Sequence, residues 1–75
     1  MTMGAMSTGD LLRELNGVTS DADARAMVSR ASRMVGASDG PLDLRELLLM
    51  CEALAAEGGP IQQLAEEIAM RAIRA

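Results

Sequence analysis

The sequence contains no Phe, Tyr, Trp or His, and it has a single cysteine, Cys51, among its 75 residues. Aromatic rings dominate most cores and binding hot spots, so Leu, Met, Ile and Ala must fill the interior here. One cysteine excludes a disulfide within the chain, and the lack of histidine argues against a zinc site. We therefore expect no cofactor, and we expect stability to come from helix packing or from association.

Basic charge is also scarce. The formal net charge is −4, and the 7 basic residues, all Arg, face 11 acidic ones. Nucleic acids and anionic membranes are bound by clustered basic residues, so neither is an expected partner. No apolar run reaches the length of a membrane span and no signal-peptide pattern opens the chain, which makes the cytoplasm the default compartment. The Arg-only, Ala-rich composition also suggests a GC-rich bacterial or phage genome.

What the chain does contain is apolar residues at helical spacing. The pattern predicts an all-α fold, a compact bundle of three main helices preceded by a short helix. Residues 1–6 are expected to be a disordered N-terminus, and residues 7–75 a single helical domain. The predicted helices span residues 8–16, 21–35, 42–57 and 61–74. Ser7 and Ser20 are the expected N-caps, and Gly17 is the expected left-handed stop of the first helix.

The most apolar stretch, LDLRELLLMCEALAAE at residues 42–57, is predicted to be both core and interface. One helical face is assigned to the core: Leu44, Leu47, Leu48, Cys51, Leu54 and Ala55. The other helices offer only modest stripes of Ala and Met, so a second apolar side is expected to remain uncovered. The predicted partner-binding residues on that side, with one from the last helix, are Leu42, Leu49, Met50, Ala53 and Met70.

The loop before this helix resembles the second half of an EF-hand calcium loop. The matching positions are the fifth, sixth, ninth and twelfth: Asp39, Gly40, Asp43 and Glu46. The resemblance implies a calcium site with Asp39, Asp43 and Glu46 as ligands. Val35 and Ala37 fall at the first and third positions, where the family has oxygen ligands, so a loop with weak or no calcium binding is expected. Acidic residues that complement a helix dipole explain the same pattern without a metal.

No enzymatic activity is expected, because no nucleophile has a base beside it and Cys51 lies among leucines in mid-helix. The leading prediction is a small protein-protein interaction module, either a homo-oligomer or an adaptor or inhibitor of a larger protein. Residues 38–42, SDGPL, lie between two helical runs and resemble the Pro-containing turn of type III secretion needle and inner-rod subunits. That resemblance implies a structural subunit of a helical assembly, which stays open beside the EF-hand-like alternative.

Overall fold

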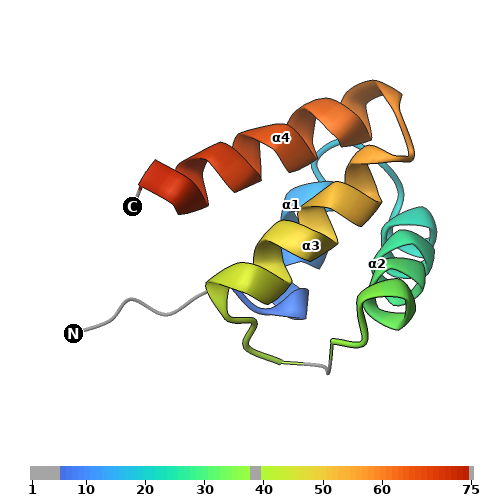
Figure 1. The fold of residues 1–75 in the computed structure, drawn as a ribbon. Helices are drawn as coiled ribbons and strands as arrows, with labels where there is room; N and C mark the ends of the chain where they lie inside the picture. Colours follow the sequence, from blue (N-terminus) through green and yellow to red (C-terminus); the bar gives the residue numbers. More distant parts are fainter. Residues whose placement is uncertain (1–5, 38–39, 75) are drawn as a thin grey trace.

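The computed structural model describes residues 6–37 and 40–74, which form four α-helices and no strand (Figure 1). The helices are α1 (Thr8–Leu15), α2 (Asp21–Val35), α3 (Leu44–Ala55) and α4 (Gly59–Arg74). α3 lies between α2 and α4, while α1 contacts both α2 and α4. The radius of gyration is 11.1 Å. The prediction of a compact all-α fold is confirmed.

α1 is a full member of the bundle and not a leading helix added to three others. It has only 8 residues, too few for a helix to persist alone in water. Its Leu11 and Leu15 are 0% and 1% exposed, so docking on the core holds it in place. The four-helix arrangement therefore corrects the expected bundle of three helices with a short one in front.

The two predicted N-caps are confirmed. The Asp10 backbone N–H donates to Ser7 Oγ at 3.2 Å, and the Ser7 N–H donates to Asp10 Oδ2 at 2.9 Å, which completes a capping box. The Asp23 N–H donates to Ser20 Oγ at 3.2 Å. The predicted left-handed stop at Gly17 is wrong, because Gly17 does not have a positive φ.

Two short extended segments tie the entrance of α1 to the entrance of α3. The Thr8 N–H donates to the Gly40 carbonyl and the Leu42 N–H to the Met6 carbonyl, each at 3.1 Å. The Gly40 N–H also donates to Thr8 Oγ1 at 3.3 Å. Met6 thus belongs to the folded unit and not to the disordered N-terminus predicted for residues 1–6, whose first five residues lie outside the described ones.

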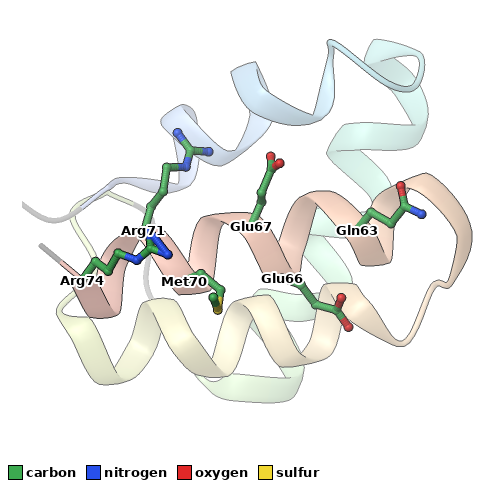
Figure 2. Close-up of a pocket in the computed structure, with 6 residues that line it drawn as sticks. All are labelled: Gln63, Glu66, Glu67, Met70, Arg71 and Arg74. Carbon is green, nitrogen blue, oxygen red and sulfur yellow. The ribbon is translucent and has the colours of Figure 1, made fainter.

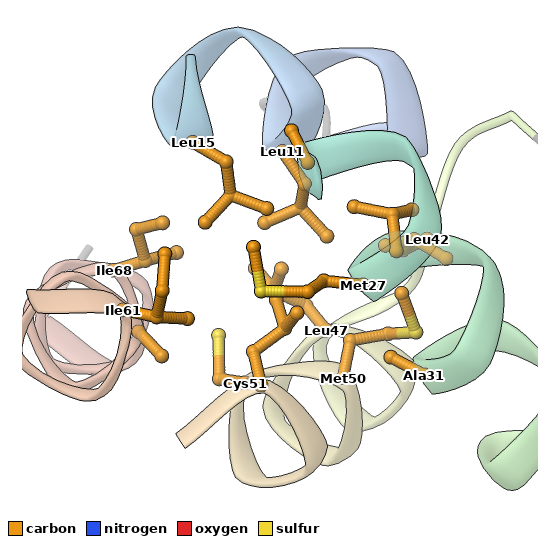
Figure 3. Close-up of a cluster of buried hydrophobic side chains, with 14 residues drawn as sticks. Leu11, Leu15, Met27, Ala31, Leu42, Leu47, Met50, Cys51, Ile61 and Ile68 are labelled. Atoms are coloured by element: carbon orange, nitrogen blue, oxygen red, sulfur yellow. The ribbon is translucent and has the colours of Figure 1, made fainter. Parts of the chain in front are cut away.

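One apolar cluster joins the four helices (Figure 3). Its largest fully buried members are Leu11, Leu15, Leu42, Met50, Leu54 and Ile68. Two small residues of α2, Ala24 and Ala31, are buried in this cluster. Leu, Ile and Met therefore fill the interior, as the lack of aromatic residues requires.

Candidate functional site

α3 begins two residues later than the sequence pattern suggested. The Glu46 N–H donates to Asp43 Oδ1 at 2.8 Å, and the Asp43 N–H donates to Glu46 Oε1 at 3.1 Å. This capping box makes the extended Asp43 (φ −77°, ψ 174°) the N-cap. Leu42 consequently lies outside the helix, and both proposed calcium ligands in the described residues are used as cap groups. The third, Asp39, lies outside the described residues.

The inner face of α3 consists of Leu47, Met50, Cys51 and Leu54, all buried. The prediction that Leu42 and Met50 lie on an uncovered side is therefore wrong, since they are 1% and 0% exposed. The bridge to Met6 directs Leu42 inward, and Met50 points toward the small Ala31 of α2 (Figure 3).

The assignment of Leu44 to the core is also wrong, because its side chain is 52% exposed. The buried stripe of α3 is turned toward α2, where small side chains leave room for Met50. Leu44 consequently falls outside it, in the first turn of the helix.

We define the outer face of α3 as Arg45, Leu48, Leu49 and Glu52, which share one side of the helix at spacings of three, four and seven residues. Arg45 and Glu52 are exposed, whereas Leu48 and Leu49 are half-buried. Neither leucine belongs to the core cluster or to the partly buried layer packed against it. Leu49 is the predicted contact residue that the structure places on this face. Ala53, also predicted, packs against the core instead.

A groove of about 300 Å³ runs beside the outer face, between α3 and α4. Its lining residues are Leu48, Leu49, Cys51, Glu52 and Ala55 from α3, and Ala65, Glu66 and Ala69 from α4. Met70, a predicted contact residue, is 55% exposed and its side chain points toward α3 (Figure 2). Ile73, one helical turn further along α4, is 65% exposed. The groove and these side chains give α3 and α4 a shared apolar surface.

A second depression, of about 490 Å³, is lined by side chains of α4 alone: Gln63, Glu66, Glu67, Met70, Arg71 and Arg74. Figure 2 shows these long side chains spreading from one helix. No second element forms a wall, so this is space between flexible side chains and not a ligand pocket.

Charged side chains beside the groove do not take part in the ion pairs that the structure shows elsewhere. The four ion pairs among the described residues are Arg13–Asp10, Arg25–Asp21, Arg30–Glu57 and Arg71–Glu14. None of them involves Arg45 or Glu52, which belong to the outer face, or Glu66, which lines the groove. The Gln62 amide donates to Glu66 at 3.1 Å. The polar rim of the surface is therefore largely free for an intermolecular partner.

Nucleophilic or metal chemistry finds little support at this surface. Cys51 is 3% exposed, and burial raises the pKa of its thiol to about 11, so it is protonated at neutral pH. Among residues 6–37 and 40–74, no three His, Cys, Asp or Glu side chains gather in a way that could hold a metal ion.

Comparison with protein-family models, curated proteins and solved structures finds no match for this chain. Within the described part of the chain, no helix has both the length and the hydrophobicity needed to cross a membrane.

Two of the predicted contact residues, Leu49 and Met70, lie on this surface. Three of its other residues, Arg45, Leu48 and Glu52, are not among the predicted ones. Together with Leu49, these three residues form one helical stripe at positions i, i+3, i+4 and i+7, which can be seen in the sequence. The expected core stripe includes Leu44 and Leu48 and omits Met50, whereas the buried stripe of α3 includes Met50 and excludes both leucines. The Asp-x-x-Glu cap at residues 43–46 would have given the correct start.

Proposed function

We propose that this protein is a helical protein-association module that binds a protein partner through the outer face of α3 and the adjoining groove. The observation that carries the proposal is the state of Leu48 and Leu49. Both are partly exposed, neither packs against the core, and both lie between charges that have no ion partner among the described residues.

The chemistry of the surface suits a protein partner better than a small molecule. Burying apolar side chains at the centre of a patch is favourable in proportion to the area removed from water, while charged residues at the rim orient the partner. Met70 and Ile73 extend the patch along α4, and both are more than half exposed. A shallow groove with no enclosing wall gives a small ligand little to bury.

The other functional expectations stay predictions. Filament formation and calcium binding have no specific observation in their favour, and the absence of enzymatic activity follows only from the sequence pattern. A cytoplasmic location and a bacterial or phage origin likewise rest on composition.

Site-specific photo-crosslinking in the source cell tests the proposal. A benzophenone side chain is placed at Leu49 in the full chain, and a matched probe is placed at Met34, which is 73% exposed and lies on α2. The expected result is a protein adduct from position 49 that is absent from position 34. Met70→Glu in the same chain should reduce the adduct, because it puts a carboxylate on the apolar surface.

Equal adducts from both positions, or none from position 49, would contradict the proposal. Circular dichroism of each variant verifies that the fold is retained. An adduct at twice the mass of the chain identifies a second copy, and an adduct at any other mass identifies a different partner.

A further inference from the structure

We infer that the partner of the outer face is a second copy of this chain, in a two-fold dimer whose α3 helices pack antiparallel. This assignment of the partner rests on the proposed function and goes beyond it by naming the occupant. It is carried by the distribution of charge along the face.

The outer face of α3 is antisymmetric in charge about its centre. Arg45 and Glu52 lie seven residues apart, with Leu48 and Leu49 midway between them. An antiparallel pairing centred between the two leucines sets Arg45 of each copy opposite Glu52 of the other. Leu48 then faces Leu49 of the other copy. A two-fold interface uses the same patch twice, so a patch with this order is complementary to itself.

The two charges oppose the dipole of their own helix. A helix favours acidic residues in its first turn and basic residues in its last. α3 has the acidic Glu46 in its first turn, but Arg45 is in the same turn, Glu52 is in the last turn, and that last turn has no basic residue. α1 and α2 both have acidic residues first and basic residues last. Arg45 and Glu52 therefore do not stabilise α3 through its dipole. Reciprocal pairing between two copies would offset their unfavourable positions.

α4 adds a carboxylate beside the outer face of α3. Glu66 of α4 lines the groove together with Glu52 of α3. Arg45 lies seven residues before Glu52 on α3, about two helical turns away. The acidic side chains of this surface are therefore at one end of the outer face and Arg45 is at the other. A copy rotated by 180° presents the opposite charge at each end, with the apolar patch facing its equivalent.

The geometry also predicts how large and how strong the assembly is. A two-fold interface is closed after two copies, whereas a head-to-tail contact would continue into a filament. α3 has 12 residues and is about 18 Å long, so the contact is at the small end of specific interfaces. A weak dimer with a dissociation constant in the micromolar range is expected, and concentrations from about 1 μM to about 1 mM would cover it.

Charge reversal followed by mixing tests this assignment. Arg45→Glu and Glu52→Arg are each measured alone by sedimentation equilibrium, and each should weaken self-association by about tenfold or more, because like charges then face each other twice. Mixed in equal amounts, the two variants should form a heterodimer, because both charge pairs are attractive again. The double variant in one chain should also recover self-association. Arg33→Glu, a reversal on α2 away from the face, is the matched control and should behave as wild type.

A wild-type chain that stays monomeric over this concentration range, or variants that associate equally well alone and mixed, would overturn the assignment of a second copy. Masses that rise beyond two chains would overturn the closed dimer. Circular dichroism of each variant separates a loss of association from unfolding. The proposed function is tested separately and is contradicted if position 49 gives no adduct at all. An adduct with a different protein would support the proposed function and would contradict only the assignment of a second copy as the partner.

Discussion

The two faces of α3 are both rich in leucine, yet they differ in what surrounds them. The inner face, with Leu47, Met50, Cys51 and Leu54, is 0% to 3% exposed and has no charged member. The outer face has two leucines at its centre and an unpaired charge at each end. The difference shows that leucine content alone does not separate core from interface, whereas the placement of charge around the leucines does.

The largest expected effect is on the inner face. Leu54 is 1% exposed, so Leu54→Ala leaves a cavity in the core. The free energy of unfolding should fall by about 2–5 kcal/mol. That is a large part of the stability of a small domain. Leu48→Ala should cost less than about 1 kcal/mol in dilute solution, since the side chain packs against no core residue. Urea unfolding of both variants measures this, and equal losses would contradict the distinction between the faces.

A second expected effect concerns the accessibility of the inner face to chemistry. Burial raises the pKa of the Cys51 thiol from 9.0 to about 11. At pH 8 the thiolate is therefore about 100-fold scarcer in the folded chain than in the unfolded one, and alkylation should slow by at least that factor. The same pKa shift makes the free energy of unfolding depend on pH. As the pH rises above 9, the unfolded thiol loses its proton first, so the folded state loses stability between pH 9 and about 11.

The alkylation rate with iodoacetamide, with and without urea, checks this effect. A matched chain carries Leu49→Cys together with Cys51→Ala, which moves the thiol to the outer face. That thiol should react nearly as fast in the folded chain as in urea. A Cys51 that reacts at the same rate in both states would show that the inner face is open to solvent.

Much of the fold could be predicted from the sequence because its signals are local. The N-caps at Ser7 and Ser20, and the end of α2 at Gly36 with a φ of 77°, follow from residues within one helical turn. The first residue of α3 could not be predicted from neighbouring residues in the same way. Pro41 suggested a helix start, whereas the backbone pairing with Met6, which is distant in sequence, holds Leu42 in an extended segment outside the helix.

The candidate site was only partly predictable for the same reason. Which side of α3 is buried depends on the small residues that α2 brings against it, and this decided the positions of Met50 and Leu44. Leu49 lies away from the core with either choice of buried stripe, which is why its position could be predicted. The unpaired state of Arg45 and Glu52 depends on where the other charges settle, which no local pattern gives.

Sedimentation equilibrium of the wild-type chain and of Leu49→Glu, each at rising concentration, tests self-association through the outer face most directly. The wild-type mass is expected to approach twice that of one chain at high concentration and to go no further. Leu49→Glu is expected to stay monomeric with an unchanged circular dichroism spectrum. A wild-type chain that remains monomeric throughout, or a Leu49→Glu variant that dimerises as well as the wild type, would contradict the account.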